Sequence, residues 1–323
     1  MNIVTVTVNP ALDKNTVVDK VLPTKKLRCE KPSYEAGGGG LNVSRALKEM
    51  GQDSLAIFLG GGPTGNHIEQ LLKADDIKHK MINTERWTRE NLMVMESTTN
   101  QEYRFVMPGL QVSKKEWEAC LNELKMFEPT PEFIVASGSL PEGISDDFYA
   151  RIAKIAEDKK SKLIIDTSGP ALLKVADIGA FLIKPNLREL SELVGKKTIS
   201  ATDQEHYARE IVNSGTCDIL VVSLGARGAM MATKDEIHYV VPPTVKQHST
   251  VGAGDSMVAG LVYALSSGMT YEDMLTLGVA AGTAATMTSG AELCHKEDVF
   301  EIFEWMKSKT HSTFIKDPHF GKE

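Results

Sequence analysis

Cysteine is scarce in this sequence of 323 residues, and long apolar segments are missing from it altogether. The four cysteines stand far apart without a Cys-x-x-Cys pair, which argues against a disulfide framework or a structural zinc site. No apolar run approaches the roughly 20 residues that cross a bilayer. The first residues predict a strand rather than a basic or cleavable leader. We therefore expect a soluble cytoplasmic protein without a membrane partner.

Positive charge is also in deficit, because 36 Lys and Arg residues face 43 Asp and Glu residues for a net charge of −7. This balance argues against a nucleic-acid partner, although a local basic pocket is compatible with it. The histidines form no His-x-x-x-His metal pair, and no Gly-x-Ser-x-Gly elbow is present to anchor a hydrolase triad. A Walker loop is missing as well.

The composition that remains, 42% hydrophobic and 24% charged residues, is that of a globular protein. From residue 133 onward, strand patterns rich in Val and Ile alternate with helical patterns. This order predicts an α/β fold whose mostly parallel sheet is covered by helices on both faces. Two irregular extended segments, at about 12–35 and 88–108, interrupt the order and predict a small separate sheet that acts as a lid. We expect one domain over residues 1–310 that contains both segments, followed by a polar tail over 311–323.

Polar residues follow the predicted strands at the points where these strands end. In a parallel sheet the carboxyl ends of the strands meet at one edge, where ligands and functional groups gather. The residues that this rule brings together are Ser139, Asp166, Asn186 and Ser223.

The most specific segment reads Ser-Thr-Val-Gly-Ala-Gly-Asp-Ser over residues 249–256 and precedes a helical stretch. Its two glycines permit a tight turn, and the free amides at the start of the helix form an anion site. Because Asp255 would repel a phosphate there, it fits better as a base that accepts a proton from a hydroxyl. Asp255 as an ordinary helix cap is the alternative, and the local pattern leaves both open.

Three further features each have two interpretations. The glycine run 37–40 with Asn42 is either a ligand loop, whose amide side chain bonds sugar hydroxyls, or a close packing turn. Asn186 and Glu189, one helical turn apart, either hold Mg²⁺ through its waters or form a capping box. The cations of the irregular segments either form a phosphate site or are solvated surface residues; these are Lys26, Arg28, Arg89 and Arg104.

The Gly-Ala-Gly-Asp segment, the early glycine run and the strand-end Asn-x-x-Glu together resemble the ribokinase-like sugar kinases of the PfkB family. The resemblance extends over about residues 1–308. It is strengthened by the segments Tyr-Arg-Phe-Val-Met-Pro-Gly over 103–109, Ser-Gly-Ser-Leu-Pro over 137–141 and Val-Val-Ser-Leu-Gly over 221–225. It implies a three-layer α/β/α fold with a small β lid and an ATP-dependent sugar-phosphate kinase.

The resemblance also implies roles for single residues. Asp255 is the base, and the amides at the transferring phosphoryl group come from Gly252, Ala253 and Gly254. The sugar is contacted by Asp13, Gly38, Gly39, Asn42 and Ser139, and its phosphate by Lys26, Arg89 and Arg104. ATP is contacted by Lys184, Asn186, Ser223, Gly225, Gly228 and Thr283. Mg²⁺ is organised by Asn186 and Glu189 with Asp166 near, and a monovalent cation such as K⁺ lies beside Ser249, Val251, Ala285, Thr288 and Gly290.

The implied reaction is phosphorylation of fructose 6-phosphate at its C1 hydroxyl, which gives fructose 1,6-bisphosphate. Tagatose 6-phosphate or fructose 1-phosphate is the alternative acceptor, because these sugars differ by one stereocentre or by the phosphate position. A sensor of sugar phosphates or nucleotides without catalysis is a remote alternative. The lids of this family also form a dimer interface, so we expect a homodimer.

Overall fold

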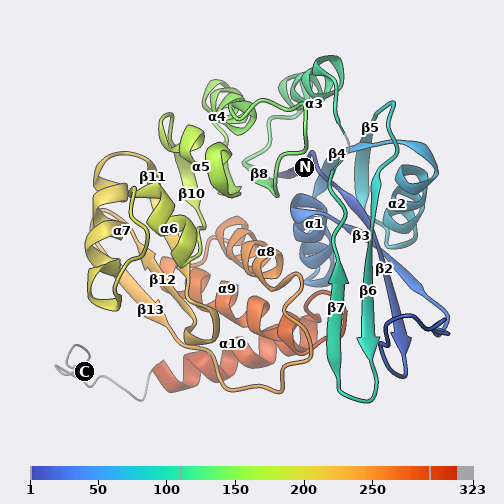
Figure 1. Ribbon diagram of the computed structural model, residues 1–323. Coiled ribbons are helices and arrows are strands. Elements are labelled where there is room, and N and C mark those ends of the chain that lie inside the picture. Colours follow the sequence, from blue (N-terminus) through green and yellow to red (C-terminus); the bar gives the residue numbers. More distant parts are fainter. Residues whose placement is uncertain (1, 110, 291, 311–323) are drawn as a thin grey trace.

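A computed structural model of the protein describes residues 2–109, 111–290 and 292–310, and at its centre lies a large β-sheet (Figure 1). The strands follow one another in the order β13-β12-β11-β10-β9-β8-β1-β4-β5. Neighbouring strands from β11 to β5 are parallel, and β12 and β13 at the other edge pair antiparallel. The strands are β1 (Ile3–Thr7), β4 (Leu55–Gly60), β5 (Lys78–Asn83), β8 (Phe133–Ser137), β9 (Lys162–Asp166), β10 (Ala180–Ile183), β11 (Cys217–Ser223), β12 (Ala229–Ala232) and β13 (Ile237–Val240).

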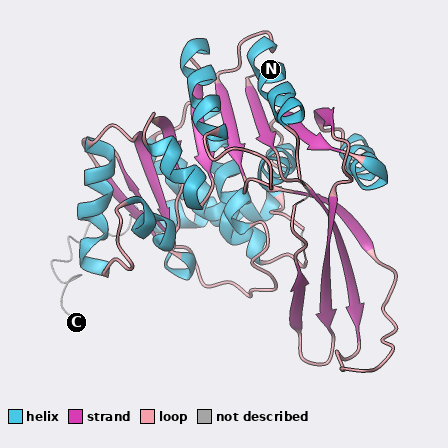
Figure 2. Ribbon diagram, turned by 45° about the horizontal axis from the view of Figure 1, so that its top comes forward, coloured by secondary structure: helices cyan, strands magenta, loops and turns pink. Residues whose placement is uncertain are grey.

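Helices cover both faces of this sheet (Figure 2). One face packs against α1 (Gly39–Glu49), α8 (Ala253–Ser266), α9 (Tyr271–Thr286) and α10 (Lys296–Thr310). The other face packs against α3 (Lys114–Met126), α4 (Phe148–Lys159), α5 (Gly169–Ala176), α6 (Leu187–Leu193) and α7 (Gln204–Asn213). Strand β8 serves both layers, since Phe133 and Val135 enter the first core and Ile134 and Ala136 the second. The predicted mostly parallel α/β architecture is confirmed.

A second, four-stranded sheet projects from the large one (Figures 1 and 2). Its order is β3-β2-β6-β7, with β2 parallel to β6 and the two outer pairs antiparallel. The strands are β2 (Ala11–Val18), β3 (Ser33–Gly37), β6 (Arg89–Glu96) and β7 (Gln101–Phe105). The two irregular segments therefore form a small separate sheet, as predicted. Its action as a lid and the domain bounds stay predictions, and the tail 311–323 lies outside the described residues.

Some elements differ from the sequence-based expectation. The triple glycine and proline over 60–63 have the composition of a loop, yet helix α2 (Gly62–Ala74) begins within them, because Pro63 occupies its first turn, where a missing amide proton costs nothing. Strand β5 was not expected, because it is an edge strand whose half-exposed sequence includes two lysines and a histidine. The short helix α5 was missed as well. Its eight residues are too few for a helical period to stand out.

Helix α8, which carries the Gly-Ala-Gly-Asp segment, is fixed by close packing against α9. A methyl group on Gly260 would lie 2.7 Å from the carbonyl oxygen of Leu277 and 2.9 Å from the Cα of Gly278. The two backbones therefore meet with no space for a side chain between them. These helices are largely buried, yet among the described residues no helix is long and apolar enough to cross a membrane.

The contact at Gly260 predicts that replacing this glycine by alanine lowers the stability of the protein. Gly→Ala in a helix interior normally stabilises by about 1 kcal/mol, but here the added methyl would overpack the α8–α9 contact. We expect Gly260→Ala to lower the free energy of unfolding by about 1–3 kcal/mol in a urea titration. Ser267→Ala, at the exposed end of α8, is the control and should be near neutral. A Gly260→Ala protein more stable than wild type would contradict this packing.

Candidate active site

The N-termini of helices α1 and α8 meet at one point, and Asp255 lies between them. Gly252 adopts a left-handed conformation (φ 69°) and begins α8, which places Asp255 in the first turn. Asn42, in the first turn of α1, donates from its Nδ2 to Asp255 Oδ2 at 2.8 Å. A hydrogen bond therefore joins the segment that follows the glycine run 37–40 to the Gly-Ala-Gly-Asp segment.

The glycine run before α1 packs closely against the ends of strands β1 and β8. A Cβ on Gly39 would overlap the hydroxyl of Ser137 and the amide nitrogen of Gly138, and one on Gly40 would overlap the end of β1. Gly38 has a φ of 118°, which side chains rarely adopt. The close-packing interpretation of this run is thus confirmed, and the packing brings the run to the Ser137–Ser139 turn.

Lys184 and Asp166 form a buried ion pair next to Asp255. Lys184 Nζ lies 3.1 Å from Asp166 Oδ1, and only 6% of the lysine side chain is exposed. The ammonium also lies 3.8 Å from the position that a Cβ of Gly254 would take, which puts it against the glycine turn. Burial opposes its charge, but Asp166, Glu189 and Asp255 outweigh that effect and raise the pKa of Lys184. Lys184 is therefore a fixed positive charge beside the amides that begin α8.

The surroundings raise the pKa of Asp255 to about 7. Burial is the main cause, and the negative charge of Asp166 adds to it, whereas the hydrogen bond from Asn42 and the charge of Lys184 act in the opposite direction. A carboxyl with a pKa near the working pH is suited to general base catalysis, since it is partly ionised and still holds a proton firmly. Asp255 thus has the properties of a base, which a cap exposed to solvent would lack.

Asn186 and Glu189 form the capping box of α6. Asn186 Oδ1 accepts from the Glu189 amide at 3.0 Å, and Glu189 Oε2 accepts from the Asn186 amide at 2.9 Å. The capping interpretation is therefore confirmed. Burial, followed by the charge of Asp166, raises the pKa of Glu189. Across the described part of the chain, no three His, Cys, Asp or Glu side chains are grouped to hold a metal ion by themselves.

Asp13 faces the site from the base of the small sheet, where it is 7% exposed. Asn91 on the neighbouring strand β6 donates to its Oδ1 at 2.8 Å. Burial raises the pKa of Asp13, against the opposing effects of the Asn91 hydrogen bond and the Arg89 charge. Because Gly37 has no side chain, its backbone can lie directly against this carboxylate.

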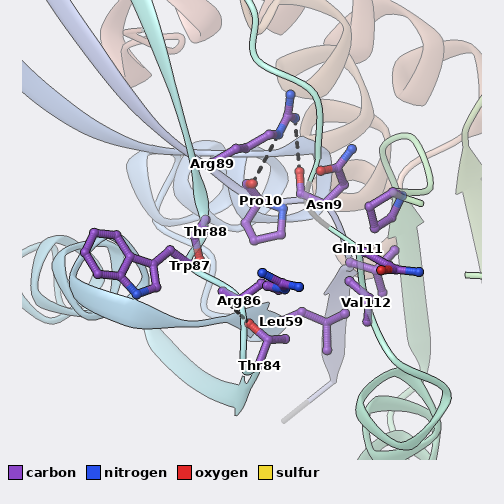
Figure 3. Close-up of a pocket in the computed structure, with 12 residues that line it drawn as sticks. Asn9, Pro10, Leu59, Thr84, Arg86, Trp87, Thr88, Arg89, Gln111 and Val112 are labelled. Carbon is purple, nitrogen blue, oxygen red and sulfur yellow. Dashed lines mark hydrogen bonds between the residues drawn. The ribbon is translucent and has the colours of Figure 1, made fainter. Parts of the chain in front are cut away.

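Arg89 is bound to backbone carbonyls. Its guanidinium donates to the carbonyl oxygens of Asn9 at 3.1 Å and Pro10 at 3.3 Å (Figure 3). It also donates to the carbonyl oxygen of Met107 at 3.0 Å. It borders a small cavity of about 30 Å³, with Trp87 and Gln111 among the other lining residues. Burial lowers the pKa of the guanidinium. Arg89 thus fastens the small sheet to the turn between β1 and β2.

The other two cations predicted for the sugar phosphate lie in different places. Lys26 is in an exposed loop beyond the far end of β2, where the Val21 amide donates to Glu96 Oε2 at 2.8 Å. Arg104 on β7 pairs with Glu102 Oε1 at 2.8 Å, with 41% of its side chain exposed. Asp13 and Arg89 lie near the start of β2 and β6, so the loop of Lys26 is at the other end of these strands. Arg104 is paired with Met93, four positions along β6 from Arg89 and on the same face of the small sheet. The structure of one chain therefore does not gather Lys26 with Arg89, whereas Arg104 shares a sheet face with it.

Ser139 lies close to the glycine run. Its Oγ accepts from Asn9 Nδ2 at 3.0 Å, so the turn after β8 and the turn after β1 are joined. Sequence reasoning did not identify Asn9, because Asn-Pro after a strand is an ordinary turn signal. The strand-end rule correctly brings Ser139, Asp166 and Asn186 to one edge.

A cleft of about 480 Å³ lies on the other side of the α8 N-terminus. Four of the residues predicted to contact ATP line it: Ser223, Gly225, Gly228 and Thr283. Ala253 and Gly254 lie at the same cleft, so the glycine turn borders it. Its apolar walls, which sequence reasoning missed, come from Pro242, Pro243, Val245, Met257 and Val279. A cleft of this size, with apolar walls and several hydroxyl groups, suits a nucleoside.

The segments predicted to flank a monovalent cation also come together. The Ser249 amide donates to the carbonyl oxygen of Thr286 at 3.4 Å, and the Val251 amide donates to Ser249 Oγ at 3.2 Å. Thr288 Oγ1 donates to the carbonyl oxygen of Ala285 at 2.9 Å, and Gly290 follows in a left-handed conformation. The start of the glycine turn is thereby joined to the end of α9.

Comparison with known proteins gives consistent matches. The family model described as pfkB family carbohydrate kinase matches residues 8–298. The ATP-dependent 6-phosphofructokinase isozyme 2 of Mycobacterium tuberculosis is 42% identical over 94% of this chain and 89% of that protein. The protein of the same name from Escherichia coli is 39% identical over 95% of this chain and 99% of its own length. The 1-phosphofructokinase of Borreliella burgdorferi is 36% identical over 92% of this chain and 95% of that protein.

The solved structures agree with the fold. The crystal structure of phosphofructokinase-2 from Escherichia coli in complex with potassium superposes with a TM-score of 0.91, at 39% identity, over 94% of this chain and 99% of that one. The structure of a tetrameric inhibited form of the same protein superposes with a TM-score of 0.89, at 39% identity, over 94% of this chain and 99% of that one. The large sheet with a smaller separate sheet is therefore a ribokinase-like arrangement.

The raised pKa of Asp255 predicts a pH-dependent gain in stability on its removal. In the unfolded chain this carboxyl ionises near pH 4, whereas in the folded chain it keeps its proton to about pH 7. Between these two pH values the unfolded chain has released this proton while the folded chain still holds it. The stability of the folded chain is therefore fully present below about pH 4 and falls, because of this group, as the pH rises to about 7. We expect Asp255→Asn to equal wild type at about pH 4 and to exceed it by roughly 1–3 kcal/mol at about pH 8.

The free energies of unfolding of wild type and Asp255→Asn are measured by urea titration across this pH range. Asp235→Asn, in a turn between β12 and β13, is the matched control, and its stability relative to wild type should change little with pH. An Asp255→Asn protein that loses stability relative to wild type as the pH rises would contradict the assignment.

Proposed function

The chain belongs to the pfkB family of carbohydrate kinases, and on that premise we propose that it transfers the γ-phosphoryl group of ATP to the C1 hydroxyl of fructose 6-phosphate. The products are fructose 1,6-bisphosphate and ADP. The observation that carries the proposal is the position of Asp255, which is bonded to Asn42 on the sugar side and adjoins the nucleotide cleft at Gly254. The named relatives at 39–42% identity support the choice of acceptor.

Asp255 is the base of the proposed reaction. Its carboxylate accepts the proton of the C1 hydroxyl while that oxygen forms a bond to the γ-phosphorus. The bond from this phosphorus to the oxygen that bridges to the β-phosphate breaks, and ADP leaves with the electron pair. The proton stays on Asp255 and passes to water after the products depart. Positioning and charge stabilisation supply most of the acceleration in reactions of this kind.

The charge of the transferring group meets fixed donors. The free amides of Gly252, Ala253 and Gly254 at the start of α8 supply hydrogen bonds and the positive end of the helix dipole. The ammonium of Lys184 lies against Gly254, and Asp166 fixes it there. These groups favour the negative charge that spreads over the γ-phosphoryl oxygens.

The family implies ATP together with a divalent metal, and the residues fit Mg²⁺ bound largely through water. The negative charge of Asp166 adds to the effect of burial in raising the pKa of Glu189, and a cation near both carboxylates would relieve this repulsion. One oxygen of Glu189 is engaged in the cap with Asn186, so direct coordination by this pair is limited. Mg²⁺ bound to the nucleotide phosphates would neutralise charge on the leaving group. Asp166, Asn186 and Glu189 would hold its water shell.

On the sugar side we assign the hydroxyl contacts to buried polar groups and glycine amides. Asp13, Asn42 and Ser139 supply the side chains, and Gly38 and Gly39 permit the sugar to approach the backbone. Arg89 adjoins this cluster through its carbonyl contacts with Asn9 and Pro10. Lys26 and Arg104 remain proposed phosphate contacts. Arg104 shares a face of the small sheet with Arg89, whereas Lys26, in the loop beyond the far end of β2, requires movement of that sheet or a second copy of the chain.

We also propose K⁺ as a monovalent cofactor and a homodimer formed through the small sheet. The potassium complex of the Escherichia coli relative supports the first, and in this chain the segments around Ser249, Val251, Ala285, Thr288 and Gly290 come together. The tetrameric form of that relative makes a larger assembly the alternative to the dimer. A glycolytic kinase of this type acts in the cytoplasm, which is the location we propose.

A panel of acceptors tests the proposed function. ADP release with MgATP is measured for fructose 6-phosphate, tagatose 6-phosphate and fructose 1-phosphate. We expect kcat/KM to be highest for fructose 6-phosphate by at least about tenfold, a factor that corresponds to about 1.4 kcal/mol of transition-state binding. Comparable values across the panel would contradict the acceptor. Tight binding of these ligands without ADP release would instead favour a sensor.

The assignment of the base is tested by Asp255→Asn, which keeps the shape of the side chain and its bond to Asn42. We expect kcat to fall by about 10²–10⁴, because a positioned base acts in the transition state, while the KM values change little. Asp235→Asn, in the turn between β12 and β13, serves as the control and should leave the kinetics unaltered. Turnover near the wild-type rate in Asp255→Asn would refute the role.

A further inference from the structure

Two buried hydroxyl groups converge on a single carbonyl oxygen behind the sugar side of the site. Tyr149 of α4 donates from its hydroxyl to the Gly138 carbonyl oxygen at 2.7 Å, and Thr167, after β9, donates to the same oxygen at 2.8 Å. Tyr149 is 0% exposed and Thr167 is 5% exposed. Neither side chain lies in the catalytic machinery described above, and a carbonyl with two side-chain donors from two elements is firmly fixed.

The other polar group of Gly138 is fixed as well. Its amide donates to the Asp166 carbonyl oxygen at 2.9 Å, and its φ of 112° is one that a residue with a side chain would resist. Gly138 is therefore held on one side by α4 and on the other by the end of β9. The next residue, Ser139, accepts the hydrogen bond from Asn9.

The fixed turn determines where the glycine run can lie. The Gly39 amide nitrogen is 3.5 Å from the position that a Cβ of Gly138 would take, so the two backbones are in contact. Movement of Gly138 would shift Ser139 directly and Gly39 by contact. Both are sugar-side residues, whereas the nucleotide cleft has no lining residue from this turn.

From this geometry we infer that Tyr149 and Thr167 are positioning residues of the sugar-phosphate site, which hold Ser139 and the glycine run through the Gly138 carbonyl. The inference rests on the proposed function for the identity of the ligand. The two donors are partly redundant. Loss of one leaves the carbonyl bonded to the other, and loss of both leaves a buried acceptor without a partner, which is the costly case.

The experiment compares Tyr149→Phe, Thr167→Val and the double variant, with KM for the sugar phosphate, KM for ATP and kcat measured separately. We expect each single variant to raise the sugar-phosphate KM by about twofold to threefold. The double variant should raise it by at least about 20-fold, more than the product of the single effects. The ATP KM should stay within about twofold of wild type in all three.

Two comparisons separate positioning from a loss of stability. Ser161→Ala removes a similar bond, from a hydroxyl to the carbonyl oxygen of Pro131 at 2.6 Å, at the opposite end of β9. It should lower stability without changing the sugar-phosphate KM. Thr167→Ser keeps a donor, so it should rescue the Tyr149→Phe background to the level of the single variant. If the double variant does not fold, Thr167→Val against Thr167→Ser still makes the test.

The inference is overturned if the double variant loses stability while its sugar-phosphate KM stays within about twofold of wild type. It is also overturned if the ATP KM rises as much as the sugar-phosphate KM, since that outcome reports general disruption. The wild-type protein distinguishes this failure from that of the proposed function. If it phosphorylates another sugar phosphate, the proposed acceptor is wrong, and the variants are then compared with the accepted sugar. If it turns over none, fructose 6-phosphate binding measured by calorimetry replaces KM.

Discussion

The hydrogen bond from Asn42 to Asp255 joins residues that are 213 positions apart, and the rest of the site is arranged around it. It can form because helices α1 and α8 lie on the same face of the large sheet and begin at the same edge. Each helix follows a glycine turn, and the turn before α1 packs directly on the ends of β1 and β8. The residues proposed for the sugar lie beyond Asn42, and the cleft proposed for the nucleotide lies beyond Gly254. In this proposal a group placed at Asp255 meets both ligands at once.

Charge is the second constraint on this site. Asp166, Glu189 and Asp255 all act on Lys184, and burial raises the pKa of each carboxyl. Such a cluster is costly in a folded protein unless cations arrive with the ligands. We interpret this cost as the physical reason for a site that takes a nucleotide together with metal ions. The raised pKa of Asp255 follows from the same crowding, so its capacity as a base and its cost to stability have one cause.

The sequence predicts the fold well where burial is continuous. Strands β1, β8, β9 and β11 are short runs rich in Val and Ile, and they stand out for that reason, whereas the half-exposed edge strand β5 does not. The strand-end rule locates Ser139, Asp166 and Asn186 because it depends on topology alone.

Local pattern could not decide whether Asn186 and Glu189 cap a helix, since both interpretations use the same spacing. It also could not find Tyr149 or Thr167, whose roles depend on a carbonyl oxygen from a distant turn.

The central claim is that Asp255, held by Asn42, is the base between two ligand sites. The pH dependence of kcat/KM for the sugar phosphate, at saturating MgATP, tests it in the wild-type protein and in Asn42→Ala. The account predicts that wild-type kcat/KM falls below about pH 7 as Asp255 takes up a proton. In Asn42→Ala this limb should move to higher pH, because the donor that favours the carboxylate is gone. A wild-type value that is constant from about pH 5.5 to about pH 8.5, or a limb that Asn42→Ala leaves in place, would contradict the account.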